Sequence, residues 1–284
     1  MLKKIITYFA IFSLIIIAWP TLARPNLVAV RVGPSGQIVT VPAVAVEVSP
    51  ALYYLGEAVD QQSGKVVEGY ALIRYKENYA KPPWAGGGQG RGTTKCYAFL
   101  GNNTKWQSNE AWLVNPENAN GLTSGFIYDN LTADITKWED AADGVINGNL
   151  INILGNGSIT NNSLNIDFTS PDGLNEVYFA DVIEPGAIAI TVVWGIFTSP
   201  PSQRELLEWD QVYDDVDYQW SASGQSGMMD FENIATHELG HSVGLADVYE
   251  SACSQVTMYG YSDYGEINKR TLEASDIIGV STLY

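Results

Sequence analysis

The sequence predicts a mixed α/β (α+β) fold, because stretches patterned as strands alternate along the chain with stretches of helical periodicity. Of its 284 residues, 46% are hydrophobic and 11% aromatic, which is enough to bury a sizeable core. The clearest strand is the continuous apolar run 187–194, which suits a buried position in a sheet. The clearest helix has apolar residues three or four apart on one face, at Ile127, Leu131, Ile135, Trp138 and Ala142.

The first 23 residues have the layout of a secretory signal peptide. Residues 1–4 supply a basic start, an apolar run covers 5–19, and 21–23 offer the small residues that a signal peptidase accepts. The run is short for a membrane span, which needs about 20 apolar residues, although an uncleaved anchor is the alternative. We therefore expect a secreted, extracellular protein with no membrane contact beyond this segment.

Residues 24–80 are expected to form a small β-rich segment. Val- and Ile-rich stretches within 27–48 flank a Gly-Pro-Ser-Gly turn at 33–36, and a third strand is predicted over 66–75. Glycine and proline are then concentrated in 81–94, which predicts a linker and a domain boundary. The segment before the linker is either a prosegment or an N-terminal extension, and the pattern leaves both open.

The main domain is expected to cover residues 95–284. Asn- and Gly-rich sequence at 147–165 favours hairpins or a surface insertion. The remaining predicted elements are a strand at 111–114, a more exposed strand within 207–220, a helix over 231–243 with Asp230 as N-cap, and a closing helix over 270–283.

Charge and cysteine content limit the partners. Thirty-two acidic residues against 15 basic ones give a formal net charge of −17, which argues against nucleic acid and against anionic membranes. We expect a monomer that acts on a protein or peptide. Export permits a disulfide between Cys96 and Cys253, the two cysteines of the chain, with two separate buried thiols as the alternative.

The chemistry is concentrated in the stretch from His237 to Asp247. Residues four apart share one face of a helix, so His237 and His241 can point their imidazoles at one Zn²⁺. Glu238 is instead turned towards a water molecule bound to the metal. Zinc lowers the pKa of this water, and Glu238 can take its proton as general base. The spacing predicts one catalytic zinc ion.

A zinc hydrolase has three protein ligands, and the third cannot be histidine because the chain has only two. Asp247 is the leading candidate, since Gly244 can turn the chain out of the helix and back to the metal. A glutamate from a later helix, Glu266 or Glu273, is the alternative.

This stretch resembles the metzincin zinc-binding consensus H-E-x-x-H-x-x-G-x-x-H, with Asp247 at the third ligand position as in snapalysin-type enzymes. Residues 256–259 resemble the Met-turn, which places Met258 beneath the zinc, and 275–284 resemble the closing helix of a matrixin catalytic domain. Residues 171–179 resemble the Asp-Gly-x-Asn segment of matrixin-like proteases. The resemblance covers about residues 95–284 and implies a twisted mixed sheet, an active-site helix, a Met-turn and a C-terminal helix.

The resemblance implies a secreted zinc endopeptidase in which Glu238 is catalytic and His237, His241 and Asp247 bind the metal. The rival interpretation is a zincin-fold surface protein that binds partners with little or no activity. Three features of relatives are missing: Gly260 stands where astacin-like and serralysin-like enzymes have a tyrosine, the matrixin Cys-switch sequence is absent, and no histidines remain for a structural zinc. The acid-rich segments permit a Ca²⁺ site.

Overall fold

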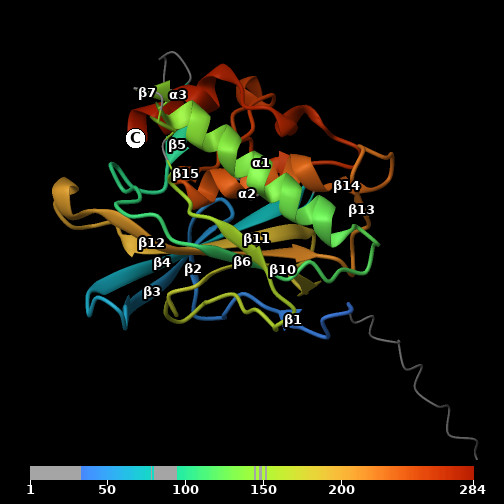
Figure 1. The fold of residues 1–284 in the computed structure, drawn as a ribbon, viewed down its shortest axis with the longest axis horizontal. Helices are drawn as coiled ribbons and strands as arrows, with labels where there is room; N and C mark the ends of the chain where they lie inside the picture. Colours follow the sequence, from blue (N-terminus) through green and yellow to red (C-terminus); the bar gives the residue numbers. More distant parts are fainter. Residues whose placement is uncertain (1–32, 78, 80–94, 144, 147–148, 151) are drawn as a thin grey trace, which may run out of the picture. The chain divides into compact units, whose positions relative to one another are not determined.

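The computed structural model of the chain describes residues 33–77, 79, 95–143, 145–146, 149–150 and 152–284, and within them ten strands form one mixed sheet (Figure 1). These strands are β1 (Ile38–Val39), β2 (Val46–Ser49), β3 (Leu52–Val59), β4 (Val66–Lys76), β6 (Trp112–Val114), β9 (Gly157–Ile159), β10 (Asn175–Val182), β11 (Ala187–Ile196), β12 (Glu205–Asp214) and β16 (Tyr261–Ser262). Their order is β2-β3-β4-β11-β12-β10-β6-β9, with β1 beside β10 and β16 beside β4.

The directions of the strands divide the sheet into two parts. Strands β9, β6, β10 and β12 run parallel to one another, which needs crossover connections between them. Strand β11 runs antiparallel to β12, and β4 runs antiparallel to β11 on its other edge. Within the described part of the chain, three short two-stranded pairs lie outside this sheet. They join β5 (Ala98–Phe99) to β15 (Leu245–Ala246), β7 (Val145–Ile146) to β8 (Asn149–Leu150), and β13 (Trp220–Ser221) to β14 (Met229–Asp230).

Three α-helices, α1 (Ser124–Asp143), α2 (Phe231–Ser242) and α3 (Ala274–Leu283), pack together beside the sheet (Figure 1). The five apolar residues that predicted α1 are all at most 5% exposed, so the periodic face is the buried face. Helix α2 begins as predicted, because the Asp230 carboxylate accepts a hydrogen bond from the Asn233 amide. Helix α3 begins at Ala274, four residues later than expected, at a capping box of Glu273 and Asp276.

Successive side chains of each strand point to opposite faces of the sheet, so they contribute to two different hydrophobic cores. Phe179 and Val193 pack with the helices, whereas their neighbours Tyr178 and Val192 pack in the second core. The strand predicted within 207–220 is real, but the expectation that it would be exposed is wrong. Strand β12 lies between β10 and β11, and its Glu208, Asp210 and Asp214 are each at most 1% exposed.

The sequence predicted two strands and a turn at 27–48, and the Gly36 amide does close a turn on the Gly33 carbonyl. Residues 1–23 and 81–94, the predicted signal peptide and linker, lie outside the described residues, so both remain predictions. Strands from both sides of 81–94 nevertheless share the sheet, since β3 and β4 join it through β11. Strand β3 was not predicted.

Cys96 and Cys253 form a disulfide, as the sequence predicted, and it ties the start of the main domain to the segment after α2. Among the helices that the structure describes, none combines the length and the apolar character needed to cross a membrane.

Candidate metal centre

Helix α2 carries the residues of the predicted site to the centre of the molecule. His237, Glu238 and His241 are each at most 1% exposed, and the helix packs against β11 and β12. Atoms of these three side chains that could bind a metal lie within 4.8 Å of one another. The spacing of four therefore brings the two imidazoles together, with their ring centroids 4.7 Å apart.

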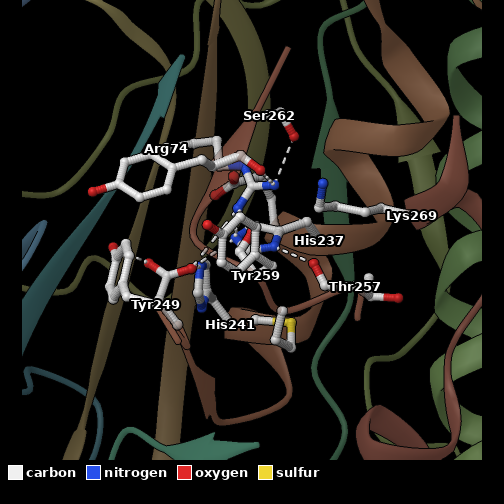
Figure 2. A network of polar contacts seen from close by, with 12 residues as sticks. Arg74, His237, His241, Tyr249, Thr257, Tyr259, Ser262 and Lys269 are labelled. Atoms are coloured by element: carbon white, nitrogen blue, oxygen red, sulfur yellow. Dashed lines mark hydrogen bonds and ion pairs between the residues drawn. The ribbon is translucent and has the colours of Figure 1, made fainter. Parts of the chain in front are cut away.

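Backbone carbonyl groups orient both imidazole rings. His237 Nδ1 lies 2.6 Å from the Thr257 carbonyl oxygen (Figure 2). His241 Nδ1 lies 2.9 Å from the Leu245 carbonyl oxygen. A carbonyl only accepts, so each Nδ1 carries a hydrogen, which in a neutral imidazole leaves the lone pair on Nε2. Burial, and after it the charge of Arg74, lowers the pKa of His237 to about 3, so this imidazole is neutral. A neutral imidazole is the form that binds metal.

Asp247 reaches the same point from beyond the helix. Gly244 has φ 105°, a conformation that side-chain-bearing residues avoid, and it turns the chain from α2 into β15. Asp247 follows β15, and its Oδ1 lies 3.1 Å from His237 Nε2 and 3.7 Å from His241 Nε2. Burial would raise the pKa of Asp247, but His241, His237 and Arg74 outweigh it and lower the pKa to about 2.

These distances fit one metal ion. Three ligands at 2.0–2.1 Å in tetrahedral geometry are about 3.3 Å apart, close to the two separations from Asp247. Asp247 Oδ1 is buried without a hydrogen-bond partner among the described residues, which is costly unless a cation binds there. The donor set of two imidazole nitrogens and a carboxylate suits Zn²⁺.

The carboxylate of Glu238 makes different contacts from those of the three candidate metal ligands. Its Oε2 accepts a 2.6 Å hydrogen bond from the Thr191 hydroxyl of β11, while its buried Oε1 has no partner among the described residues. Burial raises the pKa of Glu238, which makes its carboxylate a stronger base. One oxygen is thus fixed, and the other is available to a water molecule.

The two alternative third ligands are engaged elsewhere. Glu266 pairs with the buried Lys269, three residues on. Glu273 caps α3, where its backbone amide donates to Asp276. Of the three carboxylates that the sequence offered, Asp247 is therefore the one that lies beside the imidazoles.

Met258 lies against α2 at the bend that resembles a Met-turn. The Tyr259 amide bonds the Val256 carbonyl to close this bend, and Met258 is fully buried. A Cβ placed on Gly240 would lie 2.2 Å from Met258 Sδ, so the absence of a side chain there allows the close approach. The Asp276 carboxylate fixes the bend by accepting from the Thr257 and Met258 amides.

Sequence reasoning missed Thr191, which holds Glu238, and also Tyr249 and Arg74. The Tyr249 hydroxyl lies 3.0 Å from Asp247 Oδ2, and its ring packs over Gly260, where a Cβ would lie 2.2 Å from Tyr249 Cε1. Arg74 of β4 places Nη1 3.0 Å from His237 Nε2 (Figure 2). No local signal could have identified Arg74, which is 163 positions from His237.

A second group of acidic side chains lies where the segment before β10 meets the sheet. Asp167, Glu208 and Asp210 bring carboxylate oxygens within 4.8 Å of one another, and Glu176 lies beside them in the pairing of β10 with β12. Burial raises the pKa of Asp167 to about 6, of Glu176 to about 7 and of Glu208 to about 8. Among the described residues, no Lys or Arg forms an ion pair with any of the four.

With this geometry established, comparison with known families identifies one match. Residues 198–284 match the matrixin family. The matched range includes β12, α2, the bend at Met258 and α3, and therefore contains His237, Glu238, His241 and Asp247. No curated protein matches the chain.

The matrixin match supports a metzincin-like zinc peptidase domain. The mixed α/β architecture, with its twisted sheet and C-terminal helix, is consistent with a matrixin or metzincin fold, as the sequence predicted. The match implies a zinc cofactor, and the His-Glu-His group provides a place for it.

Proposed function

We propose that the protein is a secreted zinc-dependent endopeptidase that hydrolyses peptide bonds with Glu238 as general base. One observation carries the proposal: two imidazole nitrogens and the unpartnered Oδ1 of Asp247 converge beside a buried glutamate. The matrixin match points to the same class of hydrolase. The disulfide and the predicted signal peptide support secretion, because disulfides persist in oxidising compartments.

His237, His241 and Asp247 would hold the ion, a snapalysin-type set with aspartate as third ligand. When bound, zinc supplies a Lewis acid that polarises the scissile carbonyl and acidifies water. Glu238 takes the proton of the attacking water on Oε1 and passes it to the leaving amine, while Thr191 holds Oε2 in place. Tyr249 orients the Asp247 carboxylate.

The decisive experiment separates metal binding from turnover. Glu238→Gln should retain about one zinc per chain but lose peptide hydrolysis by about 10²–10⁴-fold, because only the base is removed. His241→Ala should lose both zinc and activity. Glu110→Gln, a change at an exposed carboxylate, is the matched control.

All variants should be assayed against an unstructured protein substrate in the natural sequence and in an Arg74→Ala background, since Arg74 lies on the metal ligands. Zinc binding without turnover in either background would favour the rival function, a zincin-fold surface protein that binds partners.

We further propose that the carboxylates of Asp167, Glu208 and Asp210 bind one Ca²⁺. Glu208 is 1% exposed and its Oε1 has no partner among the described residues, and Asp167 Oδ2 is also buried and unpartnered. Oxygen ligands within 4.8 Å of one another suit the Ca–O distance of about 2.4 Å. The ion would tie the segment around Asp167 to β12.

A further inference from the structure

Few main-chain contacts hold the backbone on either side of Asp247. Before it, the two-residue strand β15 pairs with β5 and ends opposite Ala98. After it, the Val248 amide donates to the Met258 carbonyl, and the Val248 carbonyl accepts from the Gly260 amide. The position of the candidate oxygen ligand therefore depends on two very short stretches of pairing.

Residues 250–256, here called the ligand loop, follow Asp247 and have a small hydrophobic cluster of their own. Cys253, at the end of a 3₁₀ turn, is 1% exposed and packs with the buried Val248 and Val256. This cluster is distinct from the two main cores. Three buried side chains remove too little apolar surface from water to offset the entropy cost of ordering the whole loop.

The segment at the other end of the disulfide is well anchored. Cys96 lies shortly before β5, and the Leu100 amide at the far end of this strand donates to the Gly244 carbonyl. Tyr97 packs against α3, where a Cβ on Gly279 would lie 3.0 Å from Tyr97 Cβ. The disulfide thus ties the ligand loop to a strand that is held by both α3 and the turn after α2.

This covalent tie lies beside the candidate ligand. Because β15 ends opposite Ala98, the same antiparallel register brings Cys96 opposite Val248, the residue after Asp247. Within the described residues, main-chain pairing of these two segments stops at Ala98, and the bond from Cys96 to Cys253 continues the connection beyond it.

A metal ligand has to stay in place closely. Asp247 Oδ1 lies 3.1 Å from His237 Nε2 and 3.7 Å from His241 Nε2, and ligand distances in a metal site vary by only about 0.2 Å. If Asp247 leaves this position for part of the time, the apparent dissociation constant rises in inverse proportion to the fraction of chains that keep it there. A fall of this fraction to about one tenth weakens binding about tenfold.

Resting on the proposed function, we propose that the Cys96–Cys253 disulfide positions Asp247 for the metal, so that tight zinc binding depends on the oxidation of these two thiols. Forming the bond takes two protons and two electrons from the thiols, and a disulfide donor of an oxidising compartment accepts them as it is reduced to two thiols. The chain then acquires its metal after oxidation, and in a reducing compartment it stays low in zinc and in peptidase activity.

The first experiment measures zinc affinity of the full chain by competition with a chromogenic chelator, in the natural sequence and in the Arg74→Ala background. The double change Cys96→Ser and Cys253→Ser should weaken zinc binding at least tenfold. An affinity within twofold of the parent chain in both backgrounds would overturn the proposal.

A lost disulfide also lowers stability, which needs its own control. Val114→Ala removes buried methyl groups in β6, a strand that pairs with neither β11 nor β12. It should lower the melting temperature of the metal-free chain yet change zinc affinity less than twofold. An equal loss of affinity in Val114→Ala at an equal melting temperature would assign the effect to stability alone and contradict the positioning role.

Reversible reduction makes the same comparison without a substitution. The folded chain, reduced with a phosphine in the absence of denaturant, should lose zinc affinity at least tenfold while its far-ultraviolet circular dichroism stays unchanged. Oxidised glutathione should restore the disulfide and the affinity together. Affinity that does not return with the disulfide would mean that reduction damages the fold, and the proposal would fall.

The last experiment asks whether the disulfide acts through Asp247. In an Asp247→Ala background the candidate oxygen ligand is already gone, so removing both cysteines should change the remaining zinc affinity less than twofold. A further tenfold loss in this background would show that the disulfide supports the histidines instead, and the positioning of Asp247 would be wrong.

The two proposals fail in different ways. If the disulfide-free chain binds zinc more weakly but no chain hydrolyses peptide, the peptidase function is wrong and the dependence of metal binding on the disulfide stands. If zinc affinity and hydrolysis both stay unchanged without the disulfide, the peptidase function stands and the positioning role is wrong.

Discussion

Asp247 is the residue on which the proposed metal centre depends, because it would supply an oxygen ligand beside the two histidines. Its position results from Gly244, whose φ of 105° returns the chain to the helix, and from Tyr249, whose hydroxyl lies against Oδ2. The alternative third ligands, Glu266 and Glu273, belong to segments further along the chain, and both are held in other contacts.

We predict that Asp247→Ala loses zinc and activity together, since two imidazoles alone bind the ion weakly. Loss of bound zinc should also lower the melting temperature measured with zinc present, by removing the ligand-linked stabilisation. Glu266→Ala is the matched control and should retain zinc, although it leaves the buried Lys269 without its carboxylate. Zinc retained by Asp247→Ala but released by Glu266→Ala would assign the third ligand to Glu266.

At the scale of elements, α2 and the bend at Met258 form one unit. The helix presents the imidazoles, and the bend holds the ring of His237 through the Thr257 carbonyl. Gly240 lies between the two histidines in sequence, and its bare backbone allows Met258 and Trp138 to pack against the helix. The contact of Met258 with Gly240 sets the distance between the bend and α2.

Gly240→Ala tests this unit. Alanine favours the helix by up to about 1 kcal/mol, but its Cβ would lie 2.2 Å from Met258 Sδ and 2.8 Å from Trp138 Cζ2. Overpacking should prevail and cost about 1–3 kcal/mol of unfolding free energy. Met258→Ala alone should cost about 2–5 kcal/mol by leaving a cavity.

Because each change relieves the other, the double variant in urea unfolding should be at least 1 kcal/mol more stable than the sum of the single changes predicts. Additive costs would mean that Met258 moves aside freely.

For the whole molecule, sequence predicted what is encoded locally. The periodic face of α1, the cap of α2 and the spacing of the histidines each lie within one segment, and all three reappear in the structure. Pairing across the sheet is different, because the partners of a strand are set by packing between distant segments. The pattern predicted the strand that became β4, but its place beside β11 and the contact of Arg74 with His237 could not be foreseen.

Strand β12 illustrates the same limit. Its acidic residues led to an expectation of exposure, since carboxylates are seldom buried. The structure encloses Glu208 and Asp210 because the segment before β10 lies against them, where the Asp167 amide donates to Asp210 and the Gly173 amide donates to Glu208. A buried carboxyl group without a basic partner in the described residues destabilises the fold when it ionises, and a bound proton or cation removes this cost.

The pH dependence of the free energy of unfolding should reveal the cost of ionising these buried carboxyl groups. Glu208, with a folded pKa of about 8, keeps a proton that the unfolded chain releases near pH 4.5. Stability should therefore fall as pH rises through this window.

In zinc-saturated protein at pH 8, Ca²⁺ at a hundredfold excess over its Kd should restore about 2.7 kcal/mol, or about 5 °C in Tm. The gain should shrink at pH 5.5, where protons compete, and disappear in Glu208→Gln but not in the exposed control Glu117→Gln. An equal calcium response in both variants would place the ion elsewhere.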